Sequence, residues 1–245
     1  MRVAAYQAPL LPSGSFAAIE LIRAQIKTCE SKDVEILCCP EAILGGLADY
    51  ALRPSDFAID ADNVQLAVLL APLESRSVTC IVGFTQIEGS RLYNAAGVFL
   101  GGRIVGLYRK THPAINKSVY EPGDHAPTFT VGGLKFGIII CNDSNFVEPA
   151  RTMVEKGAAA IFVPTNNGMP ENRGPAKWDS AARTCDLRMA TEYHVPIVRA
   201  DVAGRCGNLV SAGCSAITDS DGTLLQSAPP LREALLIAEI AVRAT

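Results

Sequence analysis

Short apolar runs rich in β-branched residues recur along the chain, and runs of this length between polar turns predict buried strands. They occupy residues 3–7, 34–39, 78–86, 136–140, 159–164, 196–200 and 235–240. Between several of them, apolar residues recur at helical spacing, as at Phe16, Ile19, Ile22 and Ile26. The predicted helices span residues 13–30, 63–76, 149–156 and 175–193. This alternation predicts an α/β fold with helices outside the sheet.

Two hairpins interrupt the alternation. Gly101-Gly102 separates strands predicted at 92–100 and 103–108, and the turn at 219–222 separates strands at 213–218 and 223–226. The sheet is therefore expected to be mixed. Apolar residues show no regular spacing over residues 111–127, which predicts a long loop. Long loops in compact domains are often functional. With no linker or internal repeat, residues 1–245 are expected to form one domain.

The composition limits the kinds of molecule that this protein is expected to bind. Of 245 residues, 49% are hydrophobic and 19% charged, as in a soluble globular protein, and the net charge of -3 gives no footprint for nucleic acid or an anionic membrane. No stretch approaches the roughly 20 apolar residues of a membrane span. A strand predicted directly after Met1 leaves no room for a signal peptide, so a cytoplasmic protein is expected. Its partners would be small molecules or further copies of itself.

The eight cysteines and three histidines show no zinc-like spacing. We therefore expect reduced, mostly buried thiols, no metal and no cofactor. A cysteine with a chemical role has to be identified by its neighbours.

Three reactive side chains stand at the ends of apolar strands. Cys141 follows the run 136–140 and precedes a polar turn, Glu41 follows the run ending in Pro40, and Lys110 follows the strand 103–108 closely. In open α/β sheets, ligands bind outside the carboxyl ends of strands. Taken singly, Cys141 could be a packing residue, and Glu41 and Lys110 could be solvated charges.

Together, these residue types suit acyl transfer without histidine. Backbone N–H groups at a helix start favour a thiolate, which would lower the pKa of Cys141. A partly desolvated carboxylate can take the proton of the attacking thiol. A lysine ammonium and a backbone N–H can then stabilise the developing oxyanion.

Three motifs resemble those of the nitrilase, or carbon-nitrogen hydrolase, superfamily. They are CPEA at residues 39–42, RKTH at 109–112 and GIIICND at 137–143, with YEPGD at 120–124 and GCSAI at 213–217 in support. The resemblance implies a four-layer α-β-β-α sandwich that is dimeric or larger. It also implies Glu41 as general base, Cys141 as a nucleophile that forms a thioester, and Lys110 with the Asn142 N–H as oxyanion donors.

The chain departs from the family pattern at two positions. Many members carry a second glutamate in the loop after the lysine, and by spacing Asn116 stands there, with Glu121 nearby as a possible substitute. Relatives with carboxylate-bearing substrates often have an arginine four residues after the cysteine, where this chain has Asn145. Asparagine cannot reproduce bidentate carboxylate recognition, so the resemblance favours a small neutral amide, as in aliphatic amidases.

The expected function is therefore hydrolysis of a small amide to a carboxylic acid and ammonia. Alternatives are a nitrilase, an N-carbamoyl amide hydrolase, and a non-catalytic binding or scaffold relative. A fused glutaminase is not expected, since no added synthetase domain is present in the sequence. The side chains expected to line the substrate pocket are Tyr120, Asn145, Thr165 and Asn166.

Overall fold

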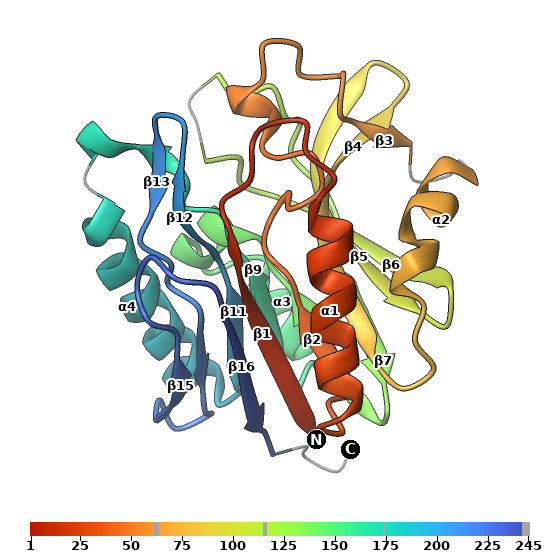
Figure 1. The fold of residues 1–245 in the computed structure, drawn as a ribbon. Coiled ribbons are helices and arrows are strands. Elements are labelled where there is room, and N and C mark those ends of the chain that lie inside the picture. Colours follow the sequence, from red (N-terminus) through yellow and green to blue (C-terminus); the bar gives the residue numbers. More distant parts are fainter. Residues whose placement is uncertain (61–63, 115–116, 174, 242–245) are drawn as a thin grey trace.

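Two β-sheets pack face to face between two outer layers of helices (Figure 1). The computed structural model describes residues 1–60, 64–114, 117–173 and 175–241. Within these residues the first sheet has ten strands. Eight of them follow the order β10 (Met169–Pro170), β13 (Leu209–Ser211), β12 (Val202–Cys206), β1 (Arg2–Pro9), β2 (Ile36–Cys38), β4 (Thr79–Glu88), β5 (Arg91–Leu100) and β6 (Arg103–Arg109). In addition, β16 (Ala234–Glu239) pairs with β1, and β3 (Ile59–Asp60) pairs with β4.

The second sheet has six strands among the described residues. Their order is β15 (Leu224–Ser227), β14 (Ala216–Thr218), β11 (Ile197–Ala200), β9 (Ile161–Pro164), β8 (Leu134–Ile138) and β7 (Thr128–Val131). The central strands are parallel within each sheet: β1, β2 and β4 in the first, and β8, β9 and β11 in the second. Both sheets are thus mixed, as predicted.

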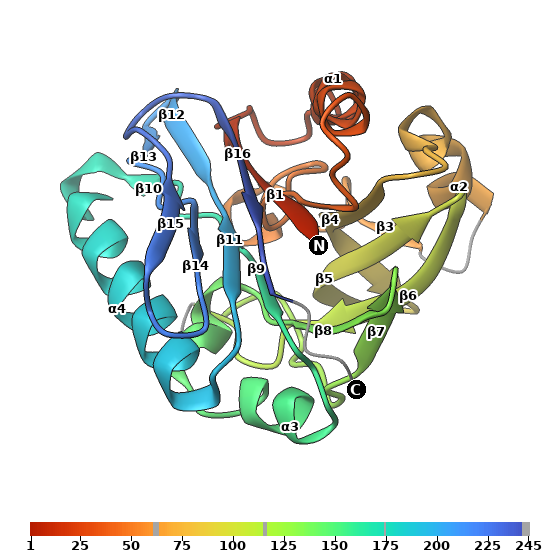
Figure 2. The ribbon, with the colours of Figure 1, turned by 90° about the horizontal axis from the view of Figure 1, so that it is seen from below.

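The helices form the outer layers (Figure 2). Helices α1 (Ala18–Glu30) and α2 (Val64–Leu70) lie outside the first sheet, and α3 (Ala150–Glu155) and α4 (Pro175–Tyr193) lie outside the second. The expected four-layer α-β-β-α sandwich is therefore confirmed. No helix of the described residues is long and apolar enough to cross a membrane.

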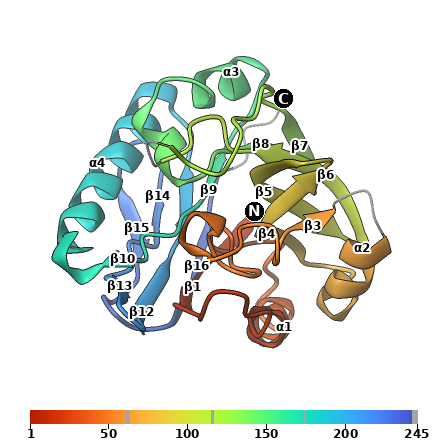
Figure 3. The ribbon, with the colours of Figure 1, turned by 90° about the horizontal axis from the view of Figure 1, so that it is seen from above.

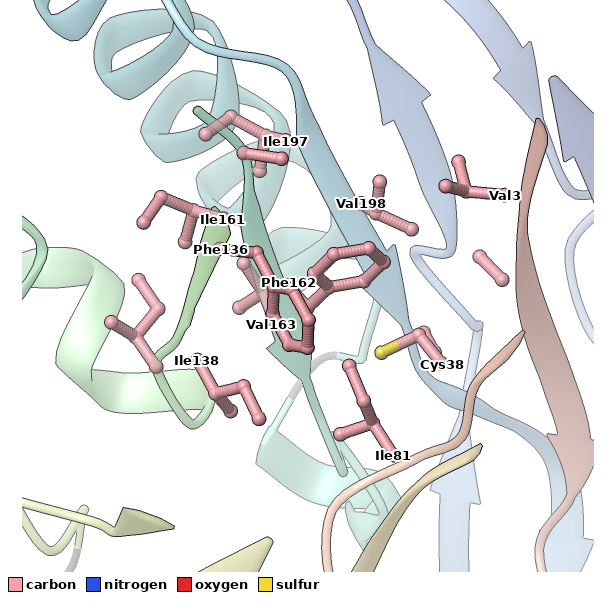
Figure 4. Close-up of a cluster of buried hydrophobic side chains, with 14 of the residues drawn as sticks. Val3, Cys38, Ile81, Phe136, Ile138, Ile161, Phe162, Val163, Ile197 and Val198 are labelled. Carbon is pink, nitrogen blue, oxygen red and sulfur yellow. The ribbon is translucent and has the colours of Figure 1, made fainter. Parts of the chain in front are cut away.

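Both faces of the central strands are buried, which explains their uninterrupted apolar sequences. On β1, Val3 and Ala5 belong to a cluster that contains residues of both sheets, whereas Ala4 and Tyr6 pack with Ile22 of α1 and its neighbours. Figure 4 shows Val3, Cys38 and Ile81 of the first sheet beside Phe162 and Val198 of the second.

The predicted elements differ from the structure where backbone chemistry overrides the apolar pattern. The helix expected at 13–30 begins only at Ala18, because Gly14 is in the left-handed region at φ 81° and the Ser15 hydroxyl accepts a hydrogen bond from the Ala17 N–H. Of the helix expected at 63–76, residue 63 lies outside the described residues. The α-helix ends at Leu70, and a short 3-10 helix (Ala71–Leu73) follows, since Pro72 has no N–H to continue it.

The carboxyl ends of the parallel strands point to one end of the sandwich. The loops after β2 and β6 lie over this end (Figure 3), where they meet the turn after β8. Met1 and the end of β16 lie at the opposite end, where the Met1 ammonium donates a hydrogen bond to the Ile240 carbonyl (Figure 1).

Candidate active site

Glu41 and Lys110 form a buried ion pair. The Lys110 Nζ lies 2.5 Å from Glu41 Oε1, and the two side chains are 4% and 2% exposed. The Asn94 side-chain amide donates to the same oxygen at 2.7 Å, and the Asn166 backbone N–H donates to Glu41 Oε2 at 2.9 Å. Burial, the largest single influence, lowers the pKa of Lys110, but the Glu41 charge, the other acidic groups nearby and the hydrogen bond to Glu41 together outweigh it, and the pKa is raised. Lys110 is therefore an ammonium whose position is fixed by Glu41.

Close backbone packing brings Lys110 to this position. Gly123 donates its N–H to the Lys110 carbonyl at 2.8 Å, and a Cβ added at Gly123 would clash with the Arg109 carbonyl. The glycine of the YEPGD motif is thus required by the close approach of two backbones, beside the lysine that the motif follows.

Cys141 begins a short 3-10 helix (Cys141–Asn145) directly at the end of the β8 region. Its φ of 46° is in the left-handed region, which a non-glycine residue adopts only when its surroundings hold it there. Burial raises the pKa of its thiol to about 12, the nearby Glu41 charge adds to the rise, and Lys110 and Arg199 oppose it. The expectation that the turn lowers this pKa is wrong, because burial outweighs the N–H groups of a single turn. At rest Cys141 is therefore a thiol, and it would need a base in order to act as a nucleophile.

Asp143 connects the Cys141 turn to the loop that follows Lys110. Its fully buried carboxylate accepts hydrogen bonds from the Ile140 N–H at 2.9 Å and from the Tyr108 hydroxyl at 2.7 Å. The His112 N–H donates to the other oxygen at 2.7 Å. Asp143 therefore joins the end of β8 in one sheet to the end of β6 in the other. These hydrogen bonds fix the position of Cys141 relative to Lys110.

A second buried ion pair lies behind the same turn. Arg199 on β11 contacts Asp186 on α4 at 2.5 Å, with side chains 1% and 2% exposed. The Arg199 guanidinium also donates to Ser144 Oγ at 3.2 Å, and that hydroxyl donates to the Cys141 carbonyl at 2.7 Å. Arg199 thus supports the backbone of the Cys141 turn.

A cavity of about 180 Å³ brings most of the predicted residues together. Glu41, Lys110 and Cys141 all line it, and so do the predicted Asn142, Tyr120, Asn145 and Asn166.

Three predicted residues lie elsewhere. Thr165 is wrong as a lining residue, because it lies behind the cavity wall, fully buried, with its hydroxyl bonded to Arg199 and to the Val163 carbonyl. Glu121 is exposed and is not among the residues that line the cavity. Asn116 lies outside the described residues.

Several lining residues are not predicted from the sequence, among them Asp49, Asn94, Asn167 and Arg199. Asn94 and Arg199 interrupt apolar strands, and a buried polar residue in such a strand is a recognisable signal. Asn167 is held by Asp201, which accepts its N–H at 3.0 Å and its side-chain amide at 3.1 Å. Its Oδ1 lies 3.9 Å from the Cys141 Sγ. Within the described part of the chain, no three His, Cys, Asp or Glu side chains are grouped to hold a metal ion.

This geometry agrees with the comparisons to known proteins. The chain matches the carbon-nitrogen hydrolase family over residues 2–245, and it belongs to that family. It is 31% identical over 221 residues to a glutamine-dependent NAD(+) synthetase from Xanthomonas campestris pv. campestris (strain 8004), a match that covers 85% of this chain and 38% of the synthetase. The chain thus spans well under half the length of that relative.

Two further relatives are amidases. An (R)-stereoselective amidase from Pseudomonas sp is 30% identical over 203 residues, which cover 82% of this chain and 70% of the amidase. The structure of an amidase from Nesterenkonia sp. AN1 has a TM-score of 0.82 at 21% identity and covers 98% of this chain and 93% of its own, a likeness of fold. The expected class of enzyme, a carbon-nitrogen hydrolase, is confirmed at the level of the family.

The raised pKa of Cys141 predicts slow alkylation of the free protein at neutral pH. Because iodoacetamide reacts with the thiolate, and the pKa is raised to about 12, the rate constant at Cys141 should rise about tenfold per pH unit from about pH 7 to about pH 10. Peptide mapping by mass spectrometry would isolate the Cys141 adduct, with glutathione as a reference thiol. A plateau below about pH 9 would contradict the raised pKa.

Proposed function

We propose that this protein hydrolyses a small amide to a carboxylic acid and ammonia through a thioester on Cys141. The observation that carries the proposal is the buried Glu41–Lys110 pair in one cavity with the Cys141 thiol. The carboxylate is available as a base, the ammonium as a donor and the thiol as a nucleophile. In the E41Q mutant of the Nesterenkonia amidase, acrylamide has added to the active-site cysteine, which supports this role for Cys141.

In the first half-reaction, Glu41 takes the thiol proton as the sulfur bonds to the amide carbon. The carbonyl oxygen becomes an oxyanion, stabilised by the Lys110 ammonium and the Asn142 N–H; one such donor is typically worth about 3–4 kcal/mol in the transition state. Protonated Glu41 then gives the proton to the amide nitrogen. The C–N bond breaks, ammonia leaves and the thioester remains.

Water completes the reaction by the reverse sequence. Glu41 takes a proton from the attacking water, the same donors hold the second oxyanion, and the C–S bond breaks. The acid leaves, and Cys141 regains its proton from Glu41. Glu41 thus acts as a base when each tetrahedral intermediate forms and as an acid when it breaks down.

An amide panel tests this proposal against its alternatives. The panel contains short aliphatic primary amides, L-glutamine, nitriles and N-carbamoyl compounds, with ammonia, acid and carbon dioxide measured. We expect ammonia and acid in equal amounts from amides. Turnover of nitriles alone would indicate a nitrilase, and release of carbon dioxide would indicate a carbamoyl hydrolase. No turnover of any compound would favour the non-catalytic alternative.

A further inference from the structure

Asp49 differs from the other charged side chains of the described cavity lining, because they have ion-pair partners and it has none. Lys110 is paired with Glu41, and Arg199 is paired with Asp186 at 2.5 Å. Asp49 is the remaining ionisable acid of the lining. Among the described residues, no lysine, arginine or histidine forms an ion pair with it; its partners are the Ser118 hydroxyl at 2.9 and 3.1 Å and the Val119 N–H at 2.9 Å. Within the described residues, the Asp49 carboxylate is therefore a charged group of the cavity wall without an ion-pair partner.

The surroundings of Asp49 fix its position and suit a cation. It lies in the short 3-10 helix Ala48–Tyr50, and the Ala48 N–H donates to the Tyr120 hydroxyl at 2.7 Å. That hydroxyl also bonds Thr85 at 2.8 Å. Tyr50 and Tyr120 line the same cavity as Asp49. A carboxylate attracts an ammonium through charge-assisted hydrogen bonds, and aromatic residues in the same cavity can add a cation–π contribution.

Asp49 also retains acceptor capacity for a ligand. A carboxylate offers about four acceptor sites, and two neutral donors, Ser118 and Val119, occupy only part of them. These two hydrogen bonds explain how Asp49 anchors the loop before Tyr120. These neutral donors do not compensate the charge of the Asp49 carboxylate. A cationic group bound in the cavity would compensate it.

At the Cys141 turn, the described part of the lining offers no matching site for an anion. Asn145 donates its side-chain amide to Asn142 Oδ1 at 2.9 Å and accepts a hydrogen bond from the Cys185 thiol at 3.3 Å. The side-chain amides of Asn145 and Asn142 carry no charge. The cationic side chains of the described lining, Lys110 and Arg199, already have carboxylate partners. A substrate carboxylate would therefore enter a cavity whose uncompensated charge repels it.

We propose that Asp49 binds a protonated amine of the substrate, so that the preferred substrates are primary amides that carry an ammonium group and no carboxylate. This inference rests on the proposed amide hydrolysis and names the substrate class for the same cavity. Asp49 is the specificity-determining residue, with Tyr50 and Tyr120 beside it.

Matched amides test the inference. Aminoalkanamides of three to five carbons are compared with neutral alkanamides of the same overall length and with dicarboxylic acid monoamides, as kcat/KM at neutral pH. We expect the wild type to prefer the ammonium compound over the neutral one by about tenfold or more, and to turn over the carboxylate compound least, as expected for a partly desolvated charge pair.

The variant Asp49→Asn separates charge from structure. Asparagine keeps an oxygen that accepts from Ser118 and Val119 but removes the charge. We expect the preference for ammonium over neutral amides to fall to about twofold or less, mainly through a higher KM, with thermal unfolding near that of the wild type. The control Glu239→Gln removes an exposed carboxylate from β16, which pairs with β1 at the opposite end of the sandwich, and should leave the preference unchanged.

The outcomes are distinct. Hydrolysis of neutral amides without any ammonium preference would overturn the inference and leave the proposed function intact. A preference that survives in Asp49→Asn would overturn the role of Asp49. If no amide is hydrolysed, the proposed function fails and takes the inference with it.

Discussion

Replacing Cys141 with alanine is expected to lower amide hydrolysis by a factor on the order of 10⁴ or more, with the fold intact. The alanine removes the proposed nucleophile without leaving a void in the core, because the thiol borders the cavity and its Sγ lies 3.9 Å from Asn167 Oδ1. The left-handed backbone at this position is equally strained with either side chain. We therefore expect a free energy of unfolding within about 1 kcal/mol of the wild type.

Ammonia release and urea unfolding on the same preparations check this result. Cys206→Ala is the matched control, since Cys206 is a half-exposed thiol of β12 that does not line the cavity, and it should retain full activity. Cys141→Ala with more than about a tenth of wild-type activity would remove Cys141 from the mechanism.

Replacing Asp186 with alanine is expected to destabilise the fold by about 3–5 kcal/mol. The change leaves the Arg199 guanidinium buried without its carboxylate, and that pair is 1% and 2% exposed. Because Arg199 also contacts Ser144 Oγ, which bonds the Cys141 carbonyl, turnover should fall as well at temperatures where the variant remains folded.

Two comparisons isolate the buried charge as the cause. Glu171→Gln breaks an ion pair with Arg205 whose side chains are 64% and 59% exposed, and it should leave the free energy of unfolding almost unchanged. The double variant Asp186→Ala/Arg199→Met removes both charges and should recover part of the stability lost in Asp186→Ala. Equal losses for Asp186→Ala and Glu171→Gln in urea unfolding would rule out a buried-charge penalty.

The sequence predicts the helices and strands that depend on local residue patterns. It does not predict strands that form only by pairing with strands distant in the chain. The helix at 175–193 agrees with α4, and the Gly101-Gly102 hairpin agrees with β5 and β6. The β12–β13 hairpin is not predicted, because Gly204 and Arg205 interrupt any apolar alternation there. Those residues are extended because β12 pairs with β1 and β13, which no local window contains.

The candidate site divides in the same way. Glu41, Lys110 and Cys141 could be selected because each follows an apolar strand and stands in a family motif. Asp49, Asn94 and Arg199 could not be placed in the cavity, since their positions depend on how the two sheets and the loops above them pack. The pKa of Cys141 is raised, whereas the sequence predicts that it is lowered. The reason is the same, because the burial that raises it results from tertiary packing.

The three central groups come from different sheets: Glu41 and Lys110 follow β2 and β6 of one, and Cys141 follows β8 of the other. The proposed catalysis therefore depends on the packing of the two sheets against each other, and neither sheet alone could support it. A partly unfolded form that kept its strands but let the sheets separate would retain the acid–base pair and the thiol, yet hold them too far apart to react. Turnover in this protein would thus report on the integrity of the inter-sheet core more directly than secondary structure content does.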